Sequence, residues 1–220
     1  MTTRMDEPSQ PAGPASGTHF REAPTEHVGF ARIELPNAEV HYWAGFFAPD
    51  EGRTLFDALR AEFWWERHRV RIRGREVDCP RLSGWQGDAT YSYSGLTLRP
   101  APWTPGVTAV RRRIEAATGE AFNSVLANLY RDGNDRMGWH ADDEPELGPA
   151  PVIASASFGA ARRFLLRPKR GRARSVPNVL EPGSLLVMRG PTQRHWLHSL
   201  PPTRRPVGPR INFTFRRILA

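Results

Sequence analysis

The chain has little of what stabilises secreted proteins or spans membranes. Its 220 residues include a single cysteine, Cys79, so no internal disulfide can form and nothing calls for an oxidising compartment. Its apolar runs are far shorter than the roughly 20 residues of a membrane-spanning helix, and the amino terminus has no signal-peptide pattern. We therefore expect a cytoplasmic protein that does not bind membranes, and we expect it to act as a monomer.

Lysine is almost absent. Lys169 is the only lysine beside 30 arginines, and the formal net charge is +8. Such a surface favours polyanions, which indicates a nucleic-acid partner. Alanine, glycine and proline are also abundant, however, and this profile is typical of GC-rich codon usage, which raises the arginine content without a functional cause. The charge therefore indicates nucleic acid without establishing it.

The first 27 residues differ in composition from the rest of the chain. Residues 1–27 are rich in proline, serine, glycine and threonine, so we expect a disordered tail. Apolar residues at helical spacing then predict one helix near Asp50, which would cap it. A second helix is predicted from Pro105 to Thr118, with Gly119 as its stop.

After Phe122 the sequence changes to short β-rich runs separated by proline, glycine and asparagine turns. These runs read SVLANLY, PVIASASF, RRFLLR, SLLVM and RINFTFRRI. Many short strands in succession indicate a sandwich or closed barrel, of which the jelly roll is one form. With two helices ahead of the strands, the sequence predicts an α+β fold.

The stretch MGWHADDEPEL concentrates one histidine and four carboxylates in a basic chain. Alternate residues of an extended segment point the same way, so His140 and Asp142 could bind one metal ion together. Two histidines and one carboxylate leave three positions of an iron(II) ion open. HWLHS offers His195 and His198 as the third ligand, and spacing alone does not choose between them. The same ligand types also suit zinc, so a zinc hydrolase is an alternative.

The carboxy-terminal strand carries a second polar pattern. In PRINFTFRR, period-two alternation puts four polar residues on one face: Arg210, Asn212, Thr214 and Arg216. In NLY, Asn128 and Tyr130 share a face in the same way. A guanidinium binds a carboxylate through two parallel hydrogen bonds, which suits a dicarboxylate cosubstrate. The alternative is an ordinary solvent-facing strand, and a zinc hydrolase would leave the two arginines unexplained.

Five motifs occur in one order along the chain: YSYSGLTL, NLYRDGNDRMGWHADDEPEL, PVIASASFGAARRFLLR, HWLHSLP and PRINFTFRRIL. Together they resemble the AlkB family of iron(II)/2-oxoglutarate dioxygenases, in particular its animal-type DNA-repair members. The resemblance extends from about Arg69 to the end of the chain. It implies a double-stranded β-helix (jelly-roll) core with flanking N-terminal helices and a nucleotide-recognition lid. The domain would span residues 28–220, with the lid and hairpin at about 67–100 and the catalytic β core at about 122–220.

The resemblance also implies the activity. Iron(II), 2-oxoglutarate and O2 would serve the oxidative dealkylation of N-alkylated bases such as 1-methyladenine and 3-methylcytosine in DNA, with succinate, CO2 and an aldehyde as products. The alternatives are the same oxygenase chemistry on RNA or protein, and a non-catalytic nucleic-acid-binding relative. A non-catalytic relative would lack metal ligands or arginines, and no such defect is visible in the sequence.

Residue by residue, the resemblance assigns three groups of functions. The iron ligands would be His140, Asp142 and His198, with His195 outside the site. The residues for 2-oxoglutarate would be Asn128, Tyr130, Arg210, Asn212, Thr214 and Arg216. The alkylated base would contact Tyr91, Tyr93 and Asp143, the tyrosines as a stacking platform in the lid and the carboxylate as a partner for a cationic base.

Two basic segments predict contacts with DNA. In RHRVRIRGR, arginines recur at every second position, and we expect one face of an extended hairpin to carry Arg69, Arg71, Arg73 and Arg75. In RPKRGRARS, a phosphate-gripping hairpin would use Arg170, Arg172 and Arg174. The alternatives are a charged edge strand for the first segment and a solvated loop for the second.

The resemblance places a finger that enters the duplex at Ile72-Arg73-Gly74. A bulky apolar or aromatic residue is expected at the middle position, and Arg73 stands there instead. A planar guanidinium can still stack on bases and fill the gap that a flipped nucleotide leaves. We therefore expect duplex DNA to be preferred to single strands.

Overall fold

The computed structural model describes residues 30–72, 75–88, 91–93, 96–98 and 100–219. Its helices are α1 (Pro49–Glu62), α2 (Pro105–Thr118) and α3 (Thr192–His195), with a 3-10 turn at Pro145–Leu147. The strands before α2 are β1 (Phe30–Arg32), β2 (Glu39–Trp43), β3 (Arg69–Ile72), β4 (Arg75–Asp78), β5 (Leu82–Gly87), β6 (Tyr91–Tyr93) and β7 (Leu96–Leu98). The strands after α2 are β8 (Ser124–Tyr130), β9 (Met137–His140), β10 (Ile153–Gly159), β11 (Arg162–Pro168), β12 (Val176–Leu180), β13 (Ser184–Arg189), β14 (Trp196–Leu200) and β15 (Arg210–Arg216).

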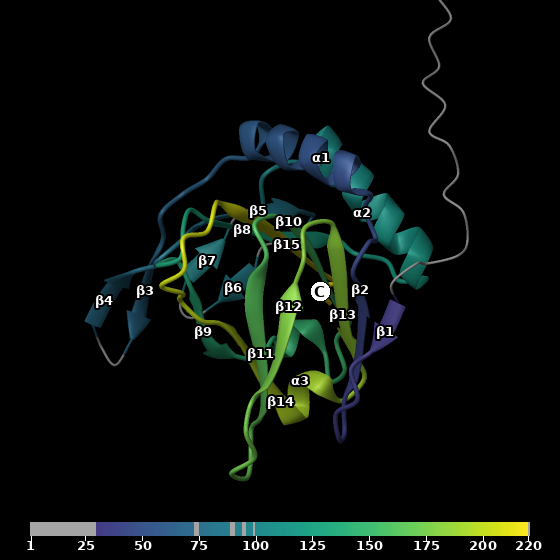
Figure 1. The fold of residues 1–220 in the computed structure, drawn as a ribbon, viewed down its shortest axis with the longest axis vertical. Coiled ribbons are helices and arrows are strands. Elements are labelled where there is room, and N and C mark those ends of the chain that lie inside the picture. Colours follow the sequence, from purple (N-terminus) through teal and green to yellow (C-terminus); the bar gives the residue numbers. More distant parts are fainter. Residues whose placement is uncertain (1–29, 73–74, 89–90, 94–95, 99, 220) are drawn as a thin grey trace, which may run out of the picture.

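Two antiparallel sheets form the two layers of a jelly roll (Figure 1). The larger sheet has seven strands in the order β1-β2-β13-β10-β15-β8-β5, and the smaller has four in the order β12-β11-β14-β9. Helices α1 and α2 cover the outer face of the larger sheet, and the β3–β4 hairpin projects from one side of the molecule. This is the predicted α+β fold with a jelly-roll core.

Alternation along the strands divides the buried residues between two sides of the larger sheet. Ile211, Phe213 and Phe215 of β15 pack with apolar residues of α1 and α2 in one core cluster. A second cluster includes Leu126 of β8 and Phe164 of β11 and so lies between the two sheets. Because successive strand residues face opposite ways, the polar residues between the β15 aromatics are directed toward this inner space. The fold thus turns the polar face of β15 inward.

Both predicted helices form, with one difference at the start of the first. Helix α2 spans Pro105–Thr118 as predicted, and Gly119 ends it in the left-handed conformation at φ 71°. Helix α1 begins two residues before the cap that we predicted: Ala48 is the N-cap residue and Asp50 lies in the first turn. The Ala48 backbone N–H donates to Glu51 Oε2 at 3.3 Å, so a glutamate replaces the predicted aspartate as the capping side chain. No helix in the described ranges combines the length and the apolar character that crossing a membrane requires.

The β core begins earlier in the chain than the predicted range of 122–220. Strand β2 pairs with β13, and β5 pairs with β8 along six register partners. Residues 82–87 therefore belong to the main sheet and not to the lid, because β5 adds an edge strand beside β8. The predicted tail, residues 1–27, lies outside the described residues.

One buried arginine holds together the two loops that flank the site. Arg162 is 3% exposed and donates hydrogen bonds to the carbonyl oxygens of Asp132 at 3.0 Å, Asp135 at 2.9 Å and Pro201 at 2.9 Å. The first two carbonyls belong to the loop before β9, and the third follows β14. Hydrogen bonds from a charged donor are stronger than neutral ones, so Arg162 stabilises the relative position of β9 and β14.

Candidate metal and cosubstrate site

The predicted metal ligands come together at the β14–β9 edge of the smaller sheet. His140 ends β9, and its register partner in the neighbouring antiparallel strand is His198, with ring centroids 4.2 Å apart. Asp142 follows β9, and its Oδ1 lies 3.8 Å from His140 Nε2. One ligand atom from each residue lies within 4.8 Å of the other two. His195 ends α3 with an exposed side chain and does not join this cluster.

Hydrogen bonds orient these ligands. His140 Nδ1 lies 2.9 Å from the Gly138 carbonyl oxygen; because a carbonyl can only accept, Nδ1 carries the proton and Nε2 is left to bind a metal. Arg216 Nη2 donates to Asp142 Oδ2 at 3.0 Å, and the Asp142 backbone N–H donates to Gln193 Oε1 at 2.9 Å. The remaining oxygen, Asp142 Oδ1, is buried and accepts no hydrogen bond from the part of the chain that the structure describes. A buried carboxylate oxygen close to a histidine nitrogen fits a bound cation.

The electrostatic surroundings prepare the ligands for metal binding. Burial raises the pKa of the Asp142 carboxyl, but the charge of Arg216 and the neighbouring imidazoles outweighs burial and lowers this pKa to about 2. Burial, with help from His140, lowers the pKa of His198 to about 3, and burial also lowers the pKa of His140. At neutral pH the carboxylate is therefore ionised and both imidazoles are neutral, which are the forms that bind metals.

A cavity lies beside the three ligands, between the two sheets. The empty space between its walls, including the part that is open to solvent at its mouth, is about 480 Å³. Strands β8 and β15 provide its polar wall, which consists of Asn128, Tyr130, Arg210, Asn212, Thr214 and Arg216. All six side chains are buried, so the alternative of a solvent-facing strand is wrong.

Arg210 is the most unusual residue of this wall. It is 1% exposed and is the largest of the fully buried side chains in the described part of the chain. Its Nη2 donates to Ser157 Oγ at 2.9 Å, and its guanidinium carbon lies 5.3 Å from the centre of the Tyr130 ring. Burial lowers the pKa of Arg210 to about 10, so the group is still cationic at neutral pH. Nε and Nη1 donate to no acceptor within the described ranges, and a buried cation of this kind suits a carboxylate ligand.

The structure adds polar residues that sequence reasoning missed. Ser155 Oγ accepts a hydrogen bond from Asn212 Nδ2 at 2.8 Å, as Ser157 does from Arg210. Two serines at period two in the apolar run ASASF were a signal for this polar face. Arg81 is different: it donates from Nε to Asn128 Oδ1 at 2.6 Å across 47 residues of sequence, and no local pattern marks it.

The predicted base-contacting residues are only partly described. Tyr91 and Tyr93 are the first and last residues of β6, but their side chains lie outside the description. Asp143 directly follows Asp142 and has a side chain that is 54% exposed, at the mouth of the site and not in the wall of the cavity. Its Oδ2 lies 2.5 Å from Lys169 Nζ, a pairing that the sequence did not predict.

The β3–β4 hairpin forms, but the predicted row of four arginines on one face is wrong. The chain reverses between Ile72 and Arg75, which are register partners, so Arg75 shares a face with Val77 and not with Arg69. Arg69 is paired within the hairpin, with Nε donating to Asp78 Oδ1 at 3.1 Å. Arg71 is the register partner of an acidic residue, Glu76. The predicted fingertip residues Arg73 and Gly74 lie outside the described residues.

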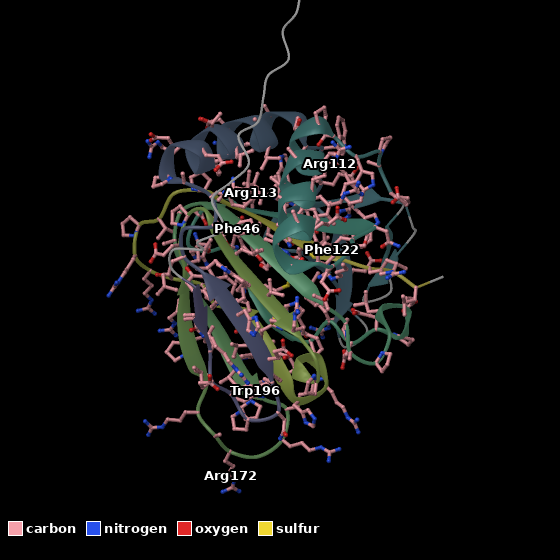
Figure 2. The ribbon with its side chains drawn as sticks, turned by 90° about the vertical axis from the view of Figure 1, so that its right-hand side faces the viewer. Phe46, Arg112, Arg113, Phe122, Arg172 and Trp196 are labelled. Carbon is pink, nitrogen blue, oxygen red and sulfur yellow. The ribbon has the colours of Figure 1, made fainter. Side chains whose placement is uncertain are left out.

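The second basic segment lies where the sequence placed it, in the connection between β11 and β12. Three of its arginines are exposed: Arg170, Arg172 and Arg174. Figure 2 shows Arg172 at the tip of this loop, at the end of the molecule opposite α1 and α2. Within the described ranges these three side chains form no hydrogen bond or ion pair, so their charges are available to a partner.

The fold and the site together define a class of enzyme. Two histidines and a carboxylate converge on one position, with a buried arginine across a cavity from them, inside a jelly roll. This donor set on one side of an iron(II) ion leaves positions open for a cosubstrate and oxygen, and Arg210 suits a carboxylate of 2-oxoglutarate. The arrangement is that of an iron(II)/2-oxoglutarate-dependent oxygenase, and the zinc-hydrolase alternative leaves Arg210 without a role.

Comparisons with known proteins agree with this class. The family model of the 2OG-Fe(II) oxygenase superfamily matches residues 39–216. The human DNA oxidative demethylase ALKBH2 is 44% identical over 218 residues, covering 94% of this chain and 81% of that protein. The human alpha-ketoglutarate-dependent dioxygenase alkB homolog 3 is 38% identical over 190 residues, covering 82% of this chain and 66% of that protein. The solved structure of OsALKBH1 aligns with a TM-score of 0.58 at 13% identity, over 84% of this chain and 100% of that one, and supports the fold alone.

The chain belongs to the 2OG-Fe(II) oxygenase superfamily and, within it, to the AlkB family. It is an iron(II)- and 2-oxoglutarate-dependent dioxygenase. His140, Asp142 and His198 are the residues that would hold the iron. When bound, iron(II) and 2-oxoglutarate supply the activation of O2, with succinate and CO2 as products; the protein contributes binding, orientation and exclusion of water.

Proposed function

We propose that this enzyme removes alkyl groups from ring nitrogens of nucleobases in DNA, such as those of 1-methyladenine and 3-methylcytosine, and releases an aldehyde. The observation that carries the proposal is the 44% identity, over 94% of this chain, to a DNA oxidative demethylase. The intact ligand set of this chain also argues against a non-catalytic relative. The net charge of +8 favours a polyanionic substrate.

Each part of the site has a task in this reaction. Arg210 would bind a carboxylate of 2-oxoglutarate, and Arg216 orients the ligand Asp142 through the bond at 3.0 Å. An alkylated base edge is inaccessible inside a stacked duplex, so the nucleotide must be flipped out or already unpaired. Tyr91 and Tyr93, on the lid strand β6, are the residues that we assign to stacking on the flipped base. The three metal ligands and the polar wall that faces them are complete within one chain, so we propose that the monomer is active.

The activity can be tested directly. Iron(II) and 2-oxoglutarate are added anaerobically to the protein, air is admitted, and oligonucleotides carrying 1-methyladenine or 3-methylcytosine are analysed by mass spectrometry of their bases. We expect restored adenine and cytosine together with stoichiometric succinate and formaldehyde. An RNA of the same sequence and an unmethylated DNA serve as controls. Consumption of 2-oxoglutarate without any change in DNA bases, or turnover of RNA alone, would contradict the proposal.

We further propose that duplex DNA is the preferred substrate. The exposed arginines of the β11–β12 loop support this, since they occupy the tip of a projecting loop and can reach phosphates. The predicted fingertip at Arg73 supplies a planar cation that could fill the gap in the stack. If so, Arg73→Ala should reduce dealkylation of double-stranded DNA far more than that of single strands, because only a duplex leaves a gap to fill.

Neutralising the β11–β12 loop should change the salt dependence of duplex binding. With alanine at Arg170, Arg172 and Arg174, the slope of log K against log salt concentration should become less negative by about 2.7, or about 0.9 for each of about three lost phosphate contacts. The matched control replaces three exposed arginines of the helices, Arg53, Arg60 and Arg112, and should leave the slope nearly unchanged. Equal slopes in both triple variants, measured by fluorescence anisotropy, would show that the loop does not grip phosphates.

A further inference from the structure

The segment that carries two of the metal ligands is held on its outer side by two cations from the end of β11. The guanidinium carbon of Arg167 lies 4.2 Å from the centre of the Trp139 ring, just before His140. Lys169 Nζ lies 2.5 Å from Asp143 Oδ2, just after Asp142. The side chain of Lys169 is 25% exposed and that of Asp143 is 54% exposed. The ion pair therefore lies at the surface of the site, one residue away from a metal ligand.

Lys169 is well placed to act on whatever approaches the metal. Its backbone N–H donates to the His195 carbonyl oxygen at 2.8 Å, which fixes the position of the backbone from which the side chain extends. Its positive charge is close enough to His198 to contribute to the lowered pKa of that ligand. It is also the only lysine in the sequence, beside 30 arginines. A lysine side chain is flexible and ends in a compact point charge, so it can leave a carboxylate more easily than a two-pronged arginine can.

The pairing has a consequence for substrate choice. Adenine alkylated at N1 and cytosine alkylated at N3 carry a positive charge at neutral pH, whereas thymine alkylated at N3 is neutral. Asp143 directly follows the metal ligand Asp142, and consecutive Cα atoms are only 3.8 Å apart. A base whose alkyl group reaches the metal therefore passes within reach of Asp143. A cationic base then competes with the Lys169 ammonium for the same carboxylate, while a neutral base does not.

Resting on the proposed function, we infer that Lys169 is a specificity-determining residue that occupies Asp143 and so reduces the enzyme's preference for cationic over neutral alkylated bases. With Lys169 in place, the mouth of the site presents a donor and an acceptor side by side. The edge of a 3-alkylated thymine offers only carbonyl oxygens, which accept, so the Lys169 ammonium can donate to it while Asp143 remains neutralised by Lys169. Without Lys169, the carboxylate is left to a cation from the substrate.

The test compares 3-methylcytosine with 3-methylthymine in otherwise identical oligonucleotides, since the two bases have similar shape and differ in charge. Lys169→Met keeps most of the side-chain length and removes the charge. We expect the ratio of kcat/KM for the cationic base to that for the neutral base to rise about three- to fivefold, the size expected for a half-exposed ion pair. In the double variant Lys169→Met/Asp143→Asn the rise in this ratio should disappear, because the Asp143 carboxylate that would bind the cationic base is absent.

Arg170→Met is the matched control. It removes one positive charge from the next residue, which is exposed, and should lower kcat/KM for both bases alike, so the ratio stays constant. A ratio that is unchanged or lower in Lys169→Met would overturn the inference, as would a rise that persists in the double variant. Equal losses on both bases with a weaker salt dependence would assign Lys169 to phosphate binding instead. If the unaltered enzyme dealkylates neither base, the proposed function fails first, and this inference fails with it.

Discussion

Replacing His198 by alanine should reduce 2-oxoglutarate turnover by at least about 100-fold, and the same loss is expected for His140→Ala and Asp142→Ala. Even residues that only support metal ligands typically change affinity or activity by 10- to 100-fold, so losing a ligand should cost at least as much. The three ligand atoms lie within 4.8 Å of one another, and no other described histidine or carboxylate joins them. Succinate formation measures turnover, and retention of cobalt(II), followed by its visible absorption, measures metal binding independently.

His195→Ala is the matched control for this series. It removes the same side chain three residues from His198, but His195 ends α3 and is exposed. We expect the His195 variant to bind cobalt(II) and to form succinate nearly as the unaltered protein does. Comparable losses at His195, or full metal binding without His198, would mean that the third ligand has been assigned to the wrong histidine.

Arg210→Lys should weaken 2-oxoglutarate binding by about tenfold or more, which corresponds to about 1.4 kcal/mol. Lysine keeps the charge but loses the planar fork that binds a carboxylate through two hydrogen bonds. It also removes the donor to Ser157 Oγ at 2.9 Å. Calorimetry under anaerobic conditions, with manganese(II) in place of iron(II), measures this affinity without turnover.

The control for Arg210→Lys is Arg163→Lys. Arg163 lies on β11 with an exposed side chain, so the same chemical change there should leave the affinity for 2-oxoglutarate unaltered. Metal binding should also survive in Arg210→Lys, because the hydrogen bond of Arg210 goes to Ser157 and not to any of the three ligands. An unchanged dissociation constant for 2-oxoglutarate in Arg210→Lys would show that another group binds the carboxylate.

Some interpretations could be made from the sequence because they depend on neighbours along the chain. Proline at the start and glycine at the end mark α2, and the structure has it at the predicted Pro105–Thr118. The alternation in PRINFTFRR predicted a polar face of β15, and all four of its residues line the cavity. The periodicity of apolar and polar residues and the capping of a helix are local properties, so a short stretch of sequence contains all the residues that cause them.

Other features depend on contacts across the fold. The hairpin turn after Ile72 reverses the chain, so Arg75 changes face and the predicted arginine row is lost. Arg81 reaches Asn128 only because β5 pairs with β8. Lys169 meets Asp143 across 26 residues of sequence. No periodicity or spacing could reveal these pairs, because sheet pairing sets the distance between the two side chains.

The sequence by itself determined the α+β class, the bounds of α2, a last strand with one polar face and two neighbouring ligands, His140 and Asp142, since each follows from period two, period 3.6 or capping chemistry. The family resemblance assigned the third ligand to His198, but only the tertiary structure supplies the physical ground for that choice. Spacing left His195 and His198 equal, whereas the fold puts one on an exposed helix end and the other in register with His140. The physical reason is that a metal site needs ligand atoms within a few ångströms of one point, and antiparallel pairing of β9 with β14 supplies that closeness between residues 58 positions apart.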